Sequence, residues 1–338
     1  MDIQSDISLG DYNTFHIDAR AKYFAAVTSL EDIVALQKED IFKNNKKLIL
    51  GGGSNLLFTG DYDGLVIKVS LPGVVLERED EHHYYVRANA GMVWHDFVRW
   101  CIDRGYAGVE NLSLIPGQIG AGPMQNIGAY GVELKDVCTA VEVIDIATGE
   151  QHIFSSAECK FGYRESVFKH EYRDQFIITA VHFRLNRTPR FNISYGDIKA
   201  TLDEMKVFDY TIRAVSDAVV KIRSSKLPDP NTLGNAGSFF KNPTVSFEQC
   251  AILLEKYPLM PHYPQPNGEV KVPAGWLIEQ CGWKGKRVGN TGAHAQQALV
   301  LVNYGGATGA EIYQLAMDIK QSVLDKFGVV INAEVNLI

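Results

Sequence analysis

Two glycine-rich segments stand out in the sequence because their composition suits contact with a ligand. The longer segment, Ile115–Gly131, contains five glycines and two prolines in seventeen residues. Glycine has no Cβ, so this backbone can adopt positive φ and lie directly against a flat molecule, while proline restricts the backbone again. A surface loop of turns is the alternative, but apolar residues such as Ile119 and Tyr130 favour a loop buried against other structure. We therefore predict that this segment forms a wall for a planar cofactor.

The shorter segment, Gly51–Asn55, follows the apolar run Lys47–Leu50, which is predicted to be a strand. Successive backbone N–H groups in such a turn form a site for an anion, and the side chains of Ser54 and Asn55 can add hydrogen bonds to a phosphate. The spacing matches neither the phosphate-binding P-loop nor the dinucleotide fingerprint Gly-x-Gly-x-x-Gly. A tight hairpin is the alternative for this segment taken alone.

Eight segments of the chain together resemble one enzyme family, the UDP-N-acetylenolpyruvoylglucosamine reductases, also called UDP-N-acetylmuramate dehydrogenases. The resemblance covers nearly the whole chain and is specific, because the segments are long and follow the family's order. They are Gly51–Leu57, Ile115–Gly131, Phe161–Ser166, Ser194–Asp197, Lys226–Pro230, Gly234–Pro243, Ala274–Ile278 and Ala333–Val335. Ser194–Asp197 and the insert at 249–263 are similar to the longer, three-domain branch of this family.

The resemblance implies an α+β protein with a two-subdomain FAD-binding fold of the vanillyl-alcohol-oxidase/PCMH type and a C-terminal α+β substrate-binding domain. The first FAD-binding subdomain is expected at residues 1–69, joined by a C-terminal strand at 329–338. The second FAD-binding subdomain is expected at residues 70–227. The substrate-binding domain is then expected at residues 228–328.

The resemblance also implies an oxidoreductase of peptidoglycan precursor synthesis. The expected reaction is the NADPH-dependent, FAD-mediated reduction of UDP-N-acetylglucosamine enolpyruvate to UDP-N-acetylmuramate. The chain has no separate dinucleotide fingerprint, which fits a nicotinamide that uses the substrate cleft in alternation with the sugar nucleotide. Gly51–Asn55 contains neither histidine nor cysteine, so we expect FAD to be bound non-covalently.

Three residues carry the chemistry that the resemblance implies: Arg164, Ser238 and Glu334. Ser238 is expected to protonate the carbon next to the reduced one, and a helix or turn cap is its alternative role. Arg164 is expected to hold the substrate carboxylate by two parallel bonds as negative charge develops, and a solvated turn arginine is the alternative. Glu334 is expected to share a proton with that carboxylate, and a water-exposed residue on the polar face of a strand is the alternative.

Further residues are carried over from the family as ligands of the cofactor and the substrate. Those expected at FAD are Gly51, Gly53, Ser54, Asn55, Pro116, Gly117, Gln125, Asn126, Gly128 and Ala129. Those expected at the UDP-sugar are Tyr195, Lys226, Asn242, Tyr263 and Gln297. The chain departs from the family at Gly122, where the family often has a hydroxyl side chain, and a backbone N–H is expected to replace that hydroxyl as a donor to the flavin.

Two other functions stay open at this point. One is a flavoprotein of the same fold that oxidises an alcohol or a sugar, although many of these attach the flavin to a histidine near the first glycine-rich segment. The other is a catalytically silent protein that binds a flavin or a sugar nucleotide. The joint presence of Arg164, Ser238 and Glu334 argues against the silent binder.

Composition narrows the range of partners and locations. A formal net charge of -7 over 338 residues argues against a nucleic-acid partner. No stretch approaches eighteen consecutive apolar residues and no secretion signal is evident, so we expect no membrane insertion and a cytoplasmic location. The five cysteines are widely spaced and the histidines lack metal-ligand spacing, so we expect buried thiols, no disulfide and no metal. No obligate protein partner is expected.

Local patterns predict several elements that can be compared with the structure. A helix is predicted at Leu30–Asn44, with Ser29 as its N-cap and Asp32 completing a capping box. Another helix is predicted from Ser246, with a capping box formed by Gln249. Thr14–Ile17 is predicted to be extended. Val329–Leu337 alternates apolar and polar residues, which predicts one long strand.

Overall fold

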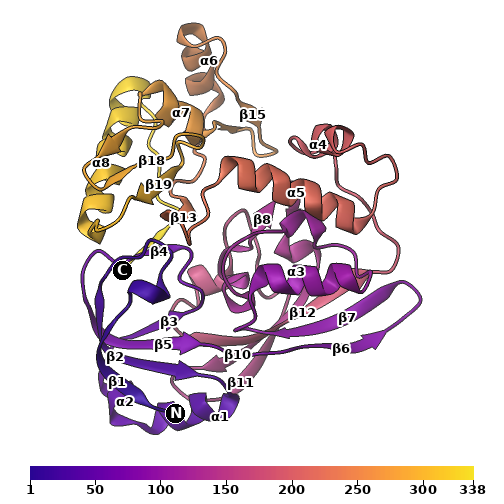
Figure 1. Cartoon of the computed structure of the whole chain (residues 1–338), viewed down its shortest axis with the longest axis vertical. Coiled ribbons are helices and arrows are strands. Elements are labelled where there is room, and N and C mark those ends of the chain that lie inside the picture. Colours follow the sequence, from indigo (N-terminus) through magenta and orange to yellow (C-terminus); the bar gives the residue numbers. More distant parts are fainter. The chain divides into compact units, whose positions relative to one another are not determined.

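A computed structural model describes residues 1–338, which form two compact units. Unit 1 comprises Met1–Ile7, Ala21–Gly52 and Asp63–Ser225, and unit 2 comprises Ser8–Arg20, Gly53–Tyr62 and Lys226–Ile338. Both units mix helices and strands (Figure 1). None of the helices is long and apolar enough to cross a membrane.

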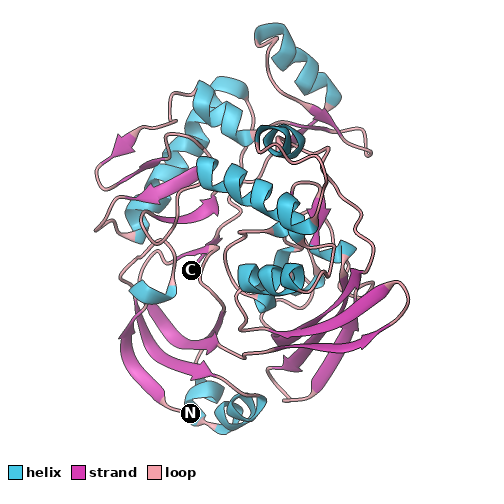
Figure 2. Ribbon diagram, turned by 45° about the vertical axis from the view of Figure 1, so that its right-hand side comes forward, coloured by secondary structure: helices cyan, strands magenta, loops and turns pink.

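The first sheet of unit 1 packs against two helices near the N-terminus. Its strands follow the order β1 (Ile3–Ser8), β2 (Arg20–Val27), β5 (Tyr62–Val69) and β3 (Lys47–Leu50). Figure 2 shows the curved sheet and, beneath it, the helices α1 (Leu30–Lys38) and α2 (Asp40–Asn44). These helices bury side chains such as Ile33, Leu36 and Phe42 against the strands.

The capping box predicted at Ser29 and Asp32 is present, but the single helix predicted for Leu30–Asn44 is wrong. Glu39 adopts φ -69° and ψ 141°, which is extended backbone, and divides the helix into α1 and α2. No proline or glycine marks this position, so the pattern of apolar residues gave no sign of the break.

The second sheet of unit 1 is antiparallel throughout. Its strands follow the order β11 (Gln151–Ser155), β10 (Cys138–Asp145), β12 (Phe176–Asn186), β7 (His83–Asn89) and β6 (Val74–Glu79). Helix α3 (Trp94–Asp103) packs against it, and the rings of Phe97 and Phe183 lie 4.4 Å apart. Helices α4 (Ile198–Glu204) and α5 (Ile212–Lys226) share a smaller core.

Unit 2 is built around a four-stranded sheet in the order β13 (Gly234–Ser238), β19 (Val300–Asn303), β18 (Thr291–Ala293) and β17 (Arg287–Val288). Its helices are α6 (Phe247–Lys256), α7 (Ala274–Gln280) and α8 (Gly309–Phe327). A small sheet holds β14 (Thr244–Val245), β16 (Val270–Lys271) and β15 (Tyr263–Pro264). The short strand β4 (Leu56–Leu57) pairs in parallel with β20 (Asn336–Leu337).

Three local predictions in unit 2 need correction. Thr14–Ile17 is not a strand, because His16 has φ 56° and the chain turns there. Val329–Leu337 alternates buried and exposed residues only as far as Asn332, since Ala333 and Glu334 are both half-buried. Only β20 at its end is a strand, and Leu337 is exposed. Ser246 caps α6 as predicted, whereas the side chain of Gln249 donates to the carbonyl of Gly328 and does not close a capping box.

Candidate functional site

The long glycine-rich segment forms closely packed backbone and short turns in unit 1. It contains two 3-10 turns, Ile119–Ala121 and Pro123–Gln125, followed by β8 (Gly128–Ala129), which pairs with β9 (Val132–Glu133). Ile119 is fully buried, as predicted for a loop packed against other structure, whereas Met124 is 39% exposed. The segment is therefore anchored on one side and accessible on another.

Glycine allows two close backbone approaches in this region. A Cβ on Gly52 would lie 3.0 Å from the Cα of Gly117, and a Cβ on Gly120 would lie 2.7 Å from the Cβ of Ala90. Contacts below about 3.4 Å are tighter than packed side chains normally tolerate. The two glycine-rich segments therefore meet backbone to backbone at Gly52 and Gly117, and any side chain at Gly52 would fill this cradle.

The amide of Gly122 bonds the protein at the position where the family often has a hydroxyl. Its N–H donates to the carbonyl of Ile119 at 3.0 Å, within the turn. The turn itself uses the Gly122 donor, and the expectation that a backbone N–H replaces the hydroxyl stays a prediction.

Four residues other than glycine adopt left-handed backbone conformations around this segment: Leu114 (φ 57°), Asn126 (φ 44°), Tyr130 (φ 50°) and Arg164 (φ 59°). Such conformations are uncommon outside glycine, asparagine and aspartate, and they often accumulate at functional sites.

Asn126 is fully buried, and its side chain donates to Gly162 and Glu133 and accepts from the amide of Lys135. Asn126 therefore fixes the course of the segment.

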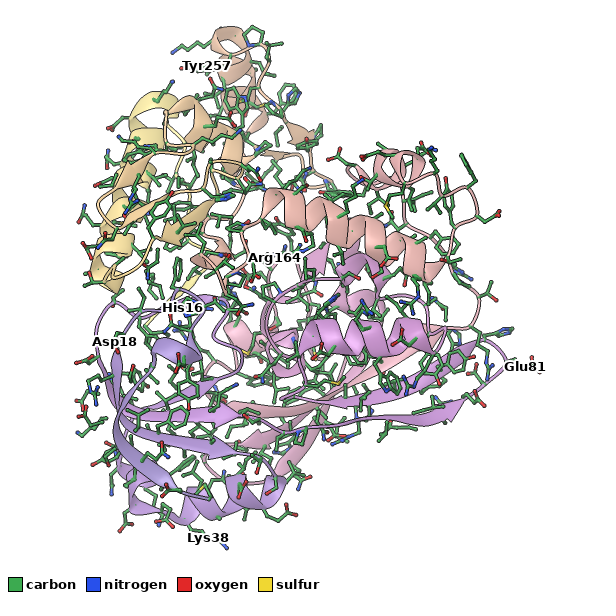
Figure 3. The ribbon with its side chains drawn as sticks, viewed as in Figure 1. His16, Asp18, Lys38, Glu81, Arg164 and Tyr257 are labelled. Carbon is green, nitrogen blue, oxygen red and sulfur yellow. The ribbon has the colours of Figure 1, made fainter.

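Arg164, which is labelled in Figure 3, lies against the end of the glycine-rich segment. A second arginine, Arg223, lies close enough for the two charges to interact. The Nη2 of Arg164 donates to the carbonyl of Gly128 at 3.0 Å, and a Cβ on Gly128 would lie 3.4 Å from the Nη1 of Arg164. Arg223 of α5 donates from Nε to the carbonyl of Leu114 at 3.2 Å. Burial lowers the pKa of Arg223, and the charge of Arg164 lowers it further.

Two neighbouring guanidinium groups suit an anionic ligand. Sequence reasoning missed Arg223. The available signal was an arginine directly after the buried Ile222, at the edge of the apolar face of an amphipathic helix.

Tyr195 is positioned at the end of the same segment in unit 1. It is 57% exposed, and a Cβ on Gly131 would lie 3.4 Å from its Cβ. The side chain of Asn111 donates to the carbonyls of Tyr130 and Asn192, and Asn192 donates to Gly131. This network joins the loop that carries Tyr195 to the glycine-rich segment.

In unit 2, Gly53 must be glycine for two reasons. Its φ is 63°, and a Cβ there would lie 2.0 Å from the carbonyl oxygen of Tyr12. Two residues further on, the carbonyl of Asn55 accepts from the amide and the side chain of Asn336. The Asn55 side chain donates to the carbonyl of Glu334 at 3.4 Å, so the structure brings these two predicted site residues together.

Ser238 and Glu334 are also brought together in unit 2. Ser238 ends β13, and the amide of Glu334 donates to the carbonyl of the next residue, Phe239, at 2.7 Å. Both residues are half-buried. Ser238 caps no helix or turn, so that alternative is wrong, and its hydroxyl has no hydrogen-bond partner in the protein. Full solvent exposure of Glu334 is also wrong.

His294 is a residue of unit 2 that sequence reasoning missed. Its Nδ1 is buried without a hydrogen-bond partner, and burial lowers the pKa of the imidazole, which favours the neutral ring. Its backbone amide donates to the carbonyl of Val300, the residue that also pairs with Ser238 across β13 and β19. A lone histidine outside any motif gives no signal in the sequence.

A cavity of about 400 Å³ in unit 2 gathers three of the five predicted substrate residues: Lys226, Asn242 and Gln297. Asn242 accepts from the amide of Ala274 at 2.9 Å, which ties it to the start of α7. Tyr263 is 54% exposed in β15 and does not line the cavity. The other residues that line it are Pro273, Gly275, Trp276, Glu279, Gln296, Ala298 and Leu299.

The cavity carries charges of both signs together with amide groups. Glu279 pairs with Lys284 at 3.0 Å. Trp276 packs against Phe327 and against Tyr257, which is labelled in Figure 3. A cation, amides, a carboxylate and an indole in one cavity suit a nucleotide, which has a charged end and a flat, hydrogen-bonding end.

Comparisons with known proteins identify the family of the chain. Residues 229–338 match the family described as UDP-N-acetylenolpyruvoylglucosamine reductase, C-terminal domain, and residues 21–155 match the FAD binding domain family. The chain is 52% identical to a UDP-N-acetylenolpyruvoylglucosamine reductase of Flavobacterium johnsoniae over 339 residues, covering 100% of both chains. It is 50% identical to one of Chromobacterium violaceum, covering 99% of this chain and 98% of that one.

A solved structure shares the fold. It is the UDP-N-acetylenolpyruvylglucosamine reductase of Thermus caldophilus, with a TM-score of 0.69 and 23% sequence identity, covering 100% of this chain and 99% of that chain.

Proposed function

The chain belongs to the UDP-N-acetylenolpyruvoylglucosamine reductase family, and from this membership we infer its reaction. It is an oxidoreductase that catalyses the NADPH-dependent, FAD-mediated reduction of UDP-N-acetylglucosamine enolpyruvate to UDP-N-acetylmuramate in peptidoglycan precursor synthesis. The observation that carries the assignment of residues is the Ser238 hydroxyl, which has no partner in the protein and lies on a strand joined to Glu334. We propose a cytoplasmic location, because the reaction consumes NADPH and a nucleotide sugar.

The glycine-rich segments fit the FAD that the family requires. The close approach of Gly52 to Gly117 and the left-handed Gly53 leave bare backbone where side chains would otherwise stand. When bound, FAD takes two electrons from NADPH and passes them to the terminal carbon of the substrate double bond. The residues proposed to hold it are Gly51, Gly53, Ser54, Asn55, Pro116, Gly117, Gln125, Asn126, Gly128 and Ala129. Because the side chain of Asn126 bonds the protein, its contribution is to position the backbone.

Arg164 is proposed to bind the substrate carboxylate. Reduction of the double bond places negative charge on the carbon next to the carboxylate, which delocalises into the carboxylate oxygens. A fixed guanidinium strengthens its contact as this charge grows, so it stabilises the transition state more than the bound substrate. The bond from Arg164 to the carbonyl of Gly128 holds the guanidinium in place before the substrate binds.

Ser238 is proposed to give its hydroxyl proton to that carbon, and Glu334 is proposed to share a proton with the substrate carboxylate. A serine hydroxyl is a weak acid, but the carbanion is strongly basic, so a donor of high pKa within hydrogen-bond reach can serve. The link from Glu334 to Phe239 fixes the distance between the two catalytic segments. A protonated or proton-sharing Glu334 avoids repulsion between two carboxylates.

The cavity in unit 2 is proposed to bind the UDP portion of the substrate. Lys226 supplies positive charge for the diphosphate, and Asn242 and Gln297 supply hydrogen bonds. Tyr195, on a loop of unit 1, and Tyr263, in β15 of unit 2, are proposed as further substrate contacts. The partners are therefore small molecules, and neither a nucleic acid nor an obligate protein partner is proposed.

Replacing Ser238 with alanine tests this assignment through two half-reactions. Stopped-flow absorbance is expected to show NADPH reducing the flavin at the wild-type rate, because the hydroxyl has no part in that step. Reoxidation by the enolpyruvyl sugar nucleotide is expected to slow about 10²- to 10⁴-fold. Ser322→Ala is the control, since that hydroxyl only bonds the carbonyl of Asp318 within α8. Equal slowing of both half-reactions in Ser238→Ala would exclude the proposed role.

A further inference from the structure

Lys68 is a half-buried cation among buried neighbours in a strand. It lies near the end of β5, where Leu65, Val66, Ile67 and Val69 are all buried. Lysine is rarely placed among such neighbours, because removing an ammonium from water is unfavourable unless another group compensates its charge. Its position therefore calls for a counter-charge.

The protein supplies only neutral partners for this ammonium. Its Nζ donates to the carbonyl of Gly51 at 2.8 Å and to Oε1 of Gln118 at 3.1 Å. An ammonium has three N–H donors, so two are used and one has no protein acceptor. No carboxylate pairs with Lys68, and burial lowers its pKa.

Lys68 stands where the two glycine-rich segments meet. In the parallel pairing of β3 and β5 it lies opposite Leu50, the residue before Gly51. Gln118 follows Gly117, the residue closest to Gly52, and its amide nitrogen donates to the carbonyl of Gly91 at 2.8 Å. The ammonium therefore bonds both segments at their point of contact.

We propose that Lys68 is a cofactor-binding residue whose ammonium is the counter-charge for the diphosphate of FAD. This rests on the proposed function, in which both glycine-rich segments hold FAD. A compact point charge suits a diphosphate, whereas the flavin ring is uncharged and flat. In this proposal the third N–H of Lys68 donates a hydrogen bond to a phosphate oxygen.

Binding of FAD and of riboflavin to flavin-free protein tests the proposal without reference to activity. Riboflavin has the ring but no phosphate, so a diphosphate contact affects FAD alone. Lys68→Gln is expected to weaken FAD binding by about tenfold to a hundredfold, the range for a hydrogen bond to a charged group, and to change riboflavin binding less than about twofold. Added salt is expected to weaken FAD binding less in this variant than in the wild type.

Two further variants separate charge from structure. Lys68→Arg keeps the charge and is expected to keep FAD affinity within a few-fold of the wild type. Lys22 is an exposed lysine of the neighbouring strand β2 and pairs with Asp63. Lys22→Gln is expected to leave the affinities for FAD and for riboflavin unchanged.

Other outcomes would overturn the proposal. Equal weakening of FAD and riboflavin in Lys68→Gln, with a lower melting temperature of the flavin-free protein, would make Lys68 a clamp between loops only. Unchanged FAD affinity would exclude any charge contact. Wild-type protein that bound no FAD would refute the proposed function itself, and this inference with it.

Discussion

The regions proposed to bind ligands are built differently in the two units. In unit 1, the glycine-rich segment, the left-handed residues and the carbonyls that hold Arg164, Arg223 and Lys68 form a region in which the backbone does most of the positioning. In unit 2, the cavity is lined by the side chains of Lys226, Asn242, Gln297 and their neighbours. Where the backbone positions the groups, a few glycines fix the geometry. Where side chains line a cavity, a substitution removes one group and leaves the others in place.

This difference predicts how each region responds to substitution. A change in unit 1 should alter a fixed geometry and therefore affect the rate of the chemistry or the stability of the fold. A change in the cavity of unit 2 should remove one interaction that substrate and transition state share, and so affect substrate binding alone.

The largest effect is expected from Arg164→Met. Loss of the guanidinium removes charge stabilisation in the transition state, so kcat/KM for the enolpyruvyl substrate should fall about 10²- to 10³-fold, mostly in kcat. Reduction of the flavin by NADPH should stay within a few-fold of the wild-type rate. Arg173→Met is the control, because Arg173 is exposed and pairs only with its neighbour Asp174. An effect confined to KM would place Arg164 with the cavity residues and remove the contrast between the units.

Gly120→Ala tests whether the backbone of unit 1 tolerates a side chain. The new Cβ would stand 2.7 Å from the Cβ of Ala90, so the free energy of unfolding should decrease by about 1–3 kcal/mol, and FAD affinity should decrease as the segment shifts. Urea unfolding and FAD titration measure the two effects. Gly60→Ala, where no atom lies within 4 Å of the new Cβ, should change neither quantity. Equal behaviour of the two variants would show that the packing around Gly120 is adaptable.

The sequence predicts the backbone-built region better than the side-chain-built cavity. The apolar residues of Ile115–Gly131 predicted a loop packed against other structure, and its glycines predicted backbone that can approach its surroundings closely, because the absence of a side chain has direct consequences for local backbone. The family resemblance predicted Lys226, Asn242 and Gln297, which the cavity brings together. Local pattern could not predict this, since the three residues are far apart in the sequence and only the folded chain makes them neighbours.

The missed residues share one property, which is that tertiary contacts define their role. Arg223, Lys68 and His294 look ordinary in the sequence, and only burial without a compensating charge or partner makes them notable. The break in the first helix at Glu39 has the same origin. No local propensity marks the extended backbone of Glu39, which lies between Leu36 and Phe42, two side chains buried in the same core.

Lys226→Met is expected to have a smaller effect, seen in KM. Loss of one charge near the diphosphate should raise KM for the sugar nucleotide about tenfold and leave kcat within about twofold, because the diphosphate does not change during the reaction. Lys221→Met is the control, since Lys221, on the surface of α5, pairs only with Glu204 of α4. Steady-state kinetics at two salt concentrations measure kcat and KM. A fall in kcat as large as that of Arg164→Met would contradict the division between the two regions.

The smallest effect is expected from changes in a side-chain network on the second sheet of unit 1. We expect this network to contribute to the stability of the fold and not to ligand binding. Glu142 accepts two hydrogen bonds from Arg87 and a third from His182, and His182 also contacts Glu77. Hydrogen bonds from Arg87 first and His182 second lower the pKa of Glu142 from 4.5 to about 2. The hydrogen bond to Glu142 is the main cause that raises the pKa of His182 above 6.5.

The signs of these shifts define a pH window for the network. The lowered pKa of Glu142 contributes stability above pH 4.5, and this stability is lost as the pH falls toward 2. The raised pKa of His182 contributes stability below pH 6.5, and this stability is lost as the pH rises through the pKa of His182 in the folded protein. His182→Gln should therefore lower the free energy of unfolding by about 1 kcal/mol near pH 5.5 and by less at pH 9, given partial solvent screening. His152→Gln, at an exposed site on β11, should show no such dependence. Loss of the same size at both pH values would mean that His182 contributes by packing alone.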